Sequence, residues 1–208
     1  MLEKMQVYFI TDSKFGKHEE LAEKALKGGV RTIQLREKRK SARKIYETAK
    51  RLRALTYDYD ALFIVNDRVD IAIAAYADGV HVGQNDLPAY AIRDFFDGIV
   101  GVSAHTVDEA KRAEMYADYL GVGPVFRTAT KEDAKTPIGI EGLEEIVKNT
   151  KLPVIAIGGI NETNAIDVLK CGVAGIAVVS AIAGKGDVTE AARTLLRIYK
   201  LSLSLPDQ

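Results

Sequence analysis

The sequence predicts a single (β/α)8 barrel, the TIM-barrel architecture of the α/β class. Eight short apolar runs alternate with helix-like runs along nearly the whole 208-residue chain. Several of the apolar runs, such as residues 154–157, are apolar at every position, as is typical of parallel strands covered on both faces. No Pro- or Ser-rich linker divides the chain. Alternation of this kind predicts a parallel sheet, and eight units favour a closed barrel over its main alternative, an open doubly wound sheet.

The predicted strands are short runs rich in β-branched and aromatic residues, each bounded by polar residues or glycine. They cover residues 6–11, 31–35, 61–65, 77–82, 99–103, 118–122, 153–157 and 174–179.

The predicted helices have apolar residues at helical spacing and follow the strands in turn. They cover residues 18–27, 41–56, 69–75, 88–95, 107–116, 142–149, 161–171 and 189–199. Ser41 and Asn161 are the expected N-caps of their helices, and Pro88 suits a first turn. We therefore expect a barrel domain over residues 1–200 and a loose C-terminal tail over residues 201–208.

Composition limits the classes of function. Lys+Arg and Asp+Glu both number 29, which argues against a general nucleic-acid or anionic-membrane binder. Cys171 is the only cysteine, so no internal disulfide forms. No apolar run reaches the length of a membrane span, and the N-terminus lacks the apolar segment of a signal peptide. We expect a cytoplasmic protein that acts on small molecules, and a homo-oligomer remains open.

Two predicted strands are each followed by a carboxylate. Asn66-Asp67 follows the third strand, and Asp86 comes shortly after the fourth. The C-terminal ends of barrel strands meet on one rim, where active sites lie. Two carboxylates facing one space suggest Mg²⁺, which takes one or two carboxylates plus water and phosphate oxygens. The alternative is that Asp67 caps a helix and Asp86 belongs to a turn.

The second strand ends in an amide and two cations. Alternation directs Gln34, Arg36 and Lys38 to the same side while the chain stays extended. Arg grips phosphate oxygens with two N–H groups and Lys adds a point charge. Arg39 and Lys40, which follow, are interpreted as a solvated basic turn.

Further polar groups follow the fifth strand. Ser103 can donate a hydrogen bond to a phosphate oxygen, and His105 is either an acid or base or a structural loop residue. His81, within a strand, is interpreted as a hydrogen-bonded core residue.

The ends of the last three strands suggest a second phosphate site. The long loop after the sixth strand holds Thr128, Thr130 and Lys131, and loops of this length usually have a function. Gly158-Gly159 ends the seventh strand and Val179-Ser180 the eighth, at the usual barrel phosphate site. Two phosphate regions on one rim, one linked to Mg²⁺, indicate group transfer from a diphosphate to a phosphorylated acceptor.

The sequence resembles the thiamine-phosphate synthase family from Tyr8 to Ser180. The motifs that carry the resemblance are YFITD (8–12), QLREK (34–38), NDRVD (66–70), ADGVHVGQNDLP (77–88), GVSAHT (101–106), GPVFRTATKEDA (123–134), AIGGI (156–160) and AVVSAI (177–182). Arg127 departs from the pattern, which has proline there. The resemblance implies transfer of a hydroxymethylpyrimidine from its diphosphate to a thiazole phosphate, giving thiamine phosphate and pyrophosphate.

The resemblance also implies roles for individual residues. Contacts to the pyrimidine diphosphate would come from Gln34, Arg36, Lys38, Asn66, Ser103 and Lys131. Contacts to the thiazole phosphate would come from Thr128, Thr130, Gly159, Val179 and Ser180. Asp67 and Asp86 would hold one Mg²⁺.

The implied mechanism is dissociative. The C–O bond to the diphosphate breaks first, while Mg²⁺, Arg36, Lys38 and Lys131 stabilise the charge on the leaving pyrophosphate. The thiazole nitrogen then attacks the methylene cation, without any protein nucleophile. Two alternatives are a thiazole tautomerase on the same barrel, which needs no diphosphate metal site, and a non-catalytic sensor of a phosphorylated metabolite.

Overall fold

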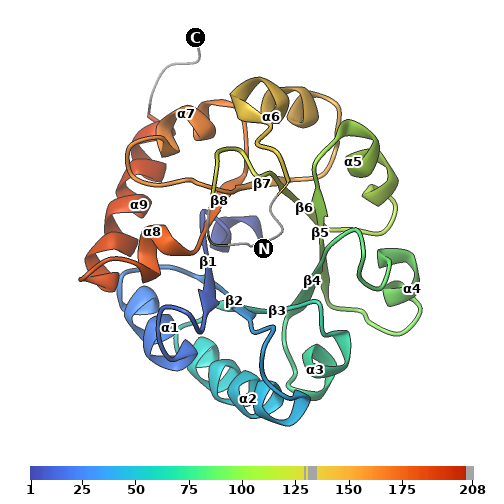
Figure 1. Cartoon of the computed structure of the whole chain (residues 1–208), viewed down its shortest axis with the longest axis vertical. Coiled ribbons are helices and arrows are strands. Elements are labelled where there is room, and N and C mark those ends of the chain that lie inside the picture. The colour runs from blue at the N-terminus through green and yellow to red at the C-terminus, as the bar shows by residue number, and fades with distance from the viewer. Residues whose placement is uncertain (129, 131–134, 205–208) are drawn as a thin grey trace.

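The computed structural model describes residues 1–128, 130 and 135–204, and they form the predicted closed barrel of eight parallel strands. The strands follow one another around the ring in chain order, and β8 pairs with β1 to close it (Figure 1). The strands are β1 Val7–Asp12, β2 Thr32–Arg36, β3 Leu62–Asn66, β4 Gly79–Val82, β5 Ile99–Ala104, β6 Tyr119–Val122, β7 Val154–Ile157 and β8 Gly175–Val178.

The α-helices surround the ring, whereas the N-terminus appears at its centre in this view (Figure 1). The helices are η1 Leu2–Lys4, α1 His18–Lys27, α2 Ala42–Asp58, α3 Val69–Ala74, α4 Ala89–Arg93, α5 Val107–Ala113, α6 Gly139–Lys148, α7 Ala165–Lys170, α8 Ser180–Ala183 and α9 Val188–Ser202. Among the described residues, no helix combines the length and apolarity needed to cross a bilayer.

The strands divide their side chains between two cores. Outward-facing residues such as Val80 and Val82 belong to the large core between strands and helices. Inward-facing residues such as Tyr8, Ile64 and Tyr119 form a smaller core inside the ring. Because side chains alternate along a strand, both faces of every strand are covered, which explains the continuous apolar runs.

Three expectations about the helices are wrong. Asn161 does not cap a helix, because α7 begins only at Ala165 with Asn164 at its N-cap position. The Asn161 carboxamide oxygen instead accepts hydrogen bonds from the backbone N–H and the hydroxyl of Thr163, which forms a turn before the helix.

The other two concern the C-terminal third. The last helix extends to Ser202, so residues 201 and 202 are helical and not part of a loose tail. A four-residue helix, α8, directly follows β8, where no separate helix is predicted.

Two aspartates hold neighbouring strands together at the N-terminal end of the barrel. The Asp118 Oδ2 accepts hydrogen bonds from the Val100 backbone N–H (2.8 Å) and from Arg93 (2.5 Å). One strand pair earlier, the Asp78 Oδ2 accepts from the Phe63 N–H and from the Arg53 guanidinium. Each carboxylate therefore ties an arginine of a preceding helix to an adjacent strand.

We expect Asp118→Ala to lower the free energy of unfolding by about 1–3 kcal/mol, because it leaves the Val100 N–H without its acceptor and removes one of three acceptors of the partly buried Arg93 guanidinium. Chemical denaturation measures this change. Asp58→Ala, at an exposed position of α2, is the control and should change stability by less than about 0.5 kcal/mol. Equal small effects for both variants would contradict the role given to Asp118.

Candidate active site

The C-terminal ends of the strands surround one cavity of about 280 Å³. Many of the predicted site residues line it, from both of the predicted phosphate regions. They are Arg36, Ser103, Thr128, Thr130, Gly159, Val179 and Ser180. The barrel thus brings residues from positions 36 to 180 to one space, as the rim argument predicts.

Arg36 is held in place by a partner that the sequence argument missed. Its Nη1 lies 2.8 Å from the Oδ2 of Asp12, the last residue of β1, and the Asp12 side chain is only 6% exposed. The two residues are direct partners in the β1–β2 register. Arg36 borders both the rim cavity and a smaller adjoining hollow that also contains Lys38. This ion pair orients the guanidinium at the boundary between the two spaces.

Lys38 and the two predicted metal ligands form a second charged group. The Lys38 Nζ lies 3.5 Å from the Oδ2 of Asp67. Burial raises the pKa of Asp67, the nearby Asp86 carboxylate raises it further, and Lys38 partly offsets both effects. Two carboxylates that repel one another at the rim provide a suitable place for a cation.

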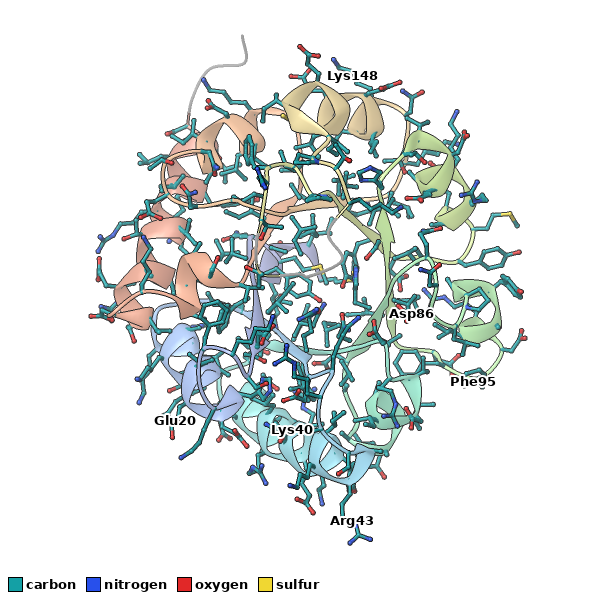
Figure 2. The ribbon with its side chains drawn as sticks, viewed as in Figure 1. Glu20, Lys40, Arg43, Asp86, Phe95 and Lys148 are labelled. Atoms are coloured by element: carbon teal, nitrogen blue, oxygen red, sulfur yellow. The ribbon has the colours of Figure 1, made fainter. Side chains whose placement is uncertain are left out.

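The local backbone tests the alternative in which Asp67 caps a helix and Asp86 belongs to a turn. Asp67 adopts a left-handed conformation (φ 61°), and the N-cap position of α3 is occupied by Arg68, so Asp67 is not the cap. The Asp86 Oδ2 accepts a 2.7 Å hydrogen bond from the Gly83 N–H, so Asp86 does belong to a turn. Asp86 lies inward of α4, whereas Phe95 lies at the outer edge (Figure 2).

Gln34 lies deeper than its predicted companions. It is 2% exposed, and its Nε2 donates a 2.8 Å hydrogen bond to the Tyr8 hydroxyl. This bond supplies the partner that a buried amide needs. Gln34 is not among the residues lining the rim cavity, so the structure does not join it to Arg36 and Lys38 at one point. Asn66, the last residue of β3, also lies outside the cavity lining.

The loop after β6 packs directly on the glycine pair after β7. Gly158 and Gly159 have φ values of 102° and 66°, which favour glycine. A Cβ on Gly159 would lie 2.7 Å from both the Arg127 carbonyl oxygen and the Phe126 Cβ. The Thr128 hydroxyl accepts a hydrogen bond from the Thr130 N–H. Lys131 lies outside the described residues.

The chain has close relatives among known proteins. The family model of thiamine monophosphate synthase matches residues 7–182. The thiamine-phosphate synthase of Archaeoglobus fulgidus is 63% identical over 197 residues, 94% of each chain. The solved thiamine phosphate pyrophosphorylase of Pyrococcus furiosus superposes with a TM-score of 0.93 at 46% identity, covering 98% of this chain and 99% of that one.

The chain belongs to the thiamine monophosphate synthase family. It is an enzyme of thiamine biosynthesis, a transferase with thiamine-phosphate synthase activity. Relatives at this level of identity decide against the tautomerase and the non-catalytic sensor.

Within this synthase, several polar residues of the site were missed or only partly interpreted. His81 contacts the Tyr119 hydroxyl through Nδ1 and the Ser103 hydroxyl through Nε2, so it is hydrogen-bonded as predicted but also reaches the site. The alternation of side chains along β4 could have predicted that His81 reaches the site. Val80 and Val82 face the helices, so His81 must face the barrel interior.

His105 has a structural environment at the edge of the cavity. Its Nδ1 lies 3.2 Å from the Gly123 carbonyl oxygen, and its backbone N–H donates to Glu109. Glu109 also binds Lys135, and this ion pair ties the loop after β6 to α5. These contacts account for the ring position and leave an acid or base role untested.

Cys171 fits the prediction of ordinary packing. It is buried, and burial raises the pKa of its thiol to about 11. The thiol is therefore protonated at neutral pH and is not a nucleophile.

We predict a pH-dependent stability difference between the wild type and Asp67→Asn. Because the folded state raises the pKa of Asp67, the stability linked to its proton is complete at low pH and lost as the pH rises through that raised pKa. The uncharged variant should therefore melt at a higher temperature than the wild type at pH 7 without divalent cations. Below about pH 3.5 the difference should vanish.

Asp70→Asn provides the control. Its pairing with Arg68 lowers the pKa of Asp70, so this variant should not gain stability at pH 7. A lower melting temperature for Asp67→Asn than for the wild type at pH 7 would contradict the repulsion between the two rim carboxylates.

Proposed function

We propose that the enzyme joins 4-amino-2-methyl-5-hydroxymethylpyrimidine diphosphate to 4-methyl-5-(2-phosphooxyethyl)thiazole, or to its carboxylate form. The products are thiamine phosphate and pyrophosphate, together with CO2 when the carboxylate form is the acceptor. The transfer is dissociative and assisted by Mg²⁺. The observation that carries this proposal is the rim cavity, which is lined by residues of both predicted phosphate regions.

The leaving diphosphate fits the side of the cavity near β2 and β5. Arg36, fixed by Asp12, offers a rigid guanidinium, and Ser103 offers a hydroxyl to the same space. Lys38 adds a cation in the adjoining hollow. Fixed donors aimed at a leaving group stabilise the charge that develops as the C–O bond breaks. Lys131 and Asn66 are proposed as further contacts, on the resemblance alone.

The Asp67–Asp86 pair fits Mg²⁺. Although the described residues contain no group of three or more His, Cys, Asp or Glu side chains suited to a metal, Mg²⁺ needs only one or two carboxylates when a diphosphate completes its shell. Burial raises the pKa of Asp67 most, and the added effect of the Asp86 carboxylate supports a cation between the two groups. When bound there, the ion would neutralise charge on the leaving pyrophosphate.

The acceptor's phosphate fits the opposite side of the cavity. The cavity is lined on that side by Thr128, Thr130, Gly159, Val179 and Ser180. The first backbone N–H groups of a helix have no partner within the helix, and α8 begins at Ser180. These N–H groups and the hydroxyls offer neutral donors to a monophosphate. On this proposal the thiazole would lie between its own phosphate and the diphosphate.

The chemistry needs no covalent step on the protein. The bond from the pyrimidine methylene to the diphosphate breaks, and its electron pair leaves with pyrophosphate. The lone pair of the thiazole nitrogen then forms the new C–N bond. The protein binds both partners, orients them and excludes water. The absence of a protein nucleophile agrees with a protonated Cys171.

We expect pyrophosphate release when the wild type is incubated with both substrates and Mg²⁺, and loss of that activity with EDTA. Asp67→Asn and Asp86→Asn should each lower the rate by at least about 100-fold, partly restored at high Mg²⁺, because each removes one charge from the metal site. Asp70→Asn, on the exposed side of α3, should retain wild-type activity. An EDTA-insensitive rate would refute the metal assignment.

A reciprocal pair of variants tests whether the two substrates occupy separate ends of the cavity. Arg36→Lys keeps the charge but loses the planar fork, so it should lower kcat/KM for the pyrimidine diphosphate by about 10-fold or more. Ser180→Ala should raise KM for the thiazole phosphate by about 5- to 10-fold, since it removes one hydroxyl donor. Steady-state kinetics with each substrate varied in turn provide the measurement. Equal effects of one variant on both substrates would argue against separate subsites.

A further inference from the structure

The barrel interior contains a continuous chain of side-chain hydrogen bonds that ends at Ser103. The Gln34 Nε2 donates to the Tyr8 hydroxyl (2.8 Å), which lies 2.9 Å from the Tyr119 hydroxyl. The Tyr119 hydroxyl lies 3.0 Å from the His81 Nδ1, and the His81 Nε2 lies 2.9 Å from the Ser103 Oγ. Five strands contribute one residue each, and the chain crosses the whole interior of the barrel.

Proton accounting gives this chain one direction. The Gln34 amide nitrogen can only donate, so the Tyr8 oxygen accepts that bond. Tyr8 is fully buried, and Gln34 and Tyr119 are the partners of its hydroxyl among the described residues. Its single proton therefore goes to Tyr119. The Tyr119 proton then goes to the His81 Nδ1.

The last two steps follow from the same accounting. With its Nδ1 accepting, a neutral His81 carries its proton on Nε2. That N–H donates to the Ser103 Oγ, so the hydroxyl of Ser103 keeps its own proton for another acceptor. Because Ser103 lines the rim cavity, a ligand in the cavity would be within reach of that proton.

Two strand glycines make room for the rings of this chain. A Cβ on Gly101 of β5 would overlap the Tyr119 phenol, and one on Gly121 of β6 would lie 2.8 Å from the His81 Cε1. Glycine within a strand weakens it and often marks a close approach. Here the approaching groups are Tyr119 and His81, so the two glycines leave space for these members of the hydrogen-bond series.

We propose that Tyr8, Tyr119 and His81 are positioning residues that set Ser103 as a hydrogen-bond donor to a phosphate oxygen of the diphosphate substrate. The inference rests on the proposed function for the identity of that acceptor. A hydroxyl that already accepts from His81 is polarised to donate, which suits an anion and disfavours a donor at the same point. The chain thus selects an oxyanion at the Ser103 position.

The opposite direction provides the rival. If Tyr119 donated to Tyr8, His81 would carry its proton on Nδ1 and its Nε2 would accept from Ser103. The Ser103 hydroxyl would then have no proton to offer the cavity. The tautomer of His81 therefore distinguishes the two directions without any substrate.

The first measurement is the ¹⁵N NMR spectrum of the histidine rings in the ligand-free protein at pH 8, where an ordinary histidine is neutral. The polypeptide has three histidines, and His81→Gln assigns the signals of His81. We expect a protonated Nε2 and an unprotonated Nδ1. Tyr119→Phe should change the His81 signals, whereas Tyr199→Phe, whose hydroxyl donates to the Ala174 carbonyl elsewhere, should not. A protonated Nδ1 in the wild type would overturn the proposal.

The second measurement is a double-mutant cycle on kcat/KM for the pyrimidine diphosphate. Ser103→Ala should lower it by about 10- to 100-fold, the range expected for a hydrogen bond to a charged group. Tyr119→Phe should lower it by about 3- to 10-fold, and Tyr8→Phe in the same direction by less. In the Ser103→Ala background, Tyr119→Phe should have almost no further effect, because its action passes through the missing hydroxyl.

Each outcome decides between a positioning and a packing role. Equal effects of Tyr119→Phe with and without Ser103 would show that the tyrosine acts through packing, and would overturn the proposal. Tyr8→Phe repeats the test if Tyr119→Phe folds poorly. If the wild type releases no pyrophosphate, the proposed function fails, while the tautomer of His81 still reports the direction of the chain.

Discussion

The alternation of side chains between the two faces of the closed barrel is the constraint on which the rest of this structure depends. Alternate residues of each strand face either the helices or the interior, and closure leaves no third choice. The outward positions are filled by apolar side chains that pack under the helices. The inward positions change along the strands, from an apolar core around Tyr8, Ile64 and Ile155 to polar residues such as Arg36 and Ser103 near the C-terminal ends. One geometric rule therefore separates the stabilising core from the site.

The charged side chains at the resulting rim are unequally paired with opposite charges. Arg36 has its own acid, Asp12, and this pair is well formed and largely buried. Asp67 has less compensation, because Asp86 opposes it and the 3.5 Å contact with Lys38 is long. On the proposed function, the diphosphate would accept hydrogen bonds from Arg36, and Mg²⁺ would lie beside Asp67 and Asp86. The cation would then relieve the repulsion between the two carboxylates, which favours binding of Mg²⁺ together with the diphosphate.

The sequence predicted the strands, the barrel and several of the residues that line the cavity, because these follow from local periodicity and from the position of strand ends. It failed where two local interactions compete, as at Asn161, and where the outcome depends on partners distant in sequence. Asn161 has the residue type of a helix cap, but its own turn with Thr163 delays the helix to Ala165. Gln34 has the expected parity, yet Tyr8 binds its amide inside the barrel. The Asp12 partner of Arg36 and the chain through Tyr119 have no local signal in the sequence, since each requires knowing which strands are neighbours.

A buried polar chain would be an expensive way merely to fill a barrel, because an apolar interior of the same volume avoids every unsatisfied group. Tyr8 and Tyr119 are fully buried, and burial raises the pKa of both phenols far above neutral pH, so they remain neutral hydroxyls with one proton each. Such groups cannot act as acids or bases in the transfer, but they can transmit orientation, because each has one proton to give. A reaction without a protein nucleophile depends on where the donors point before the leaving group departs. The interior of the barrel thus extends the rim site downward, and its polar residues are explained by the donor that they fix at Ser103.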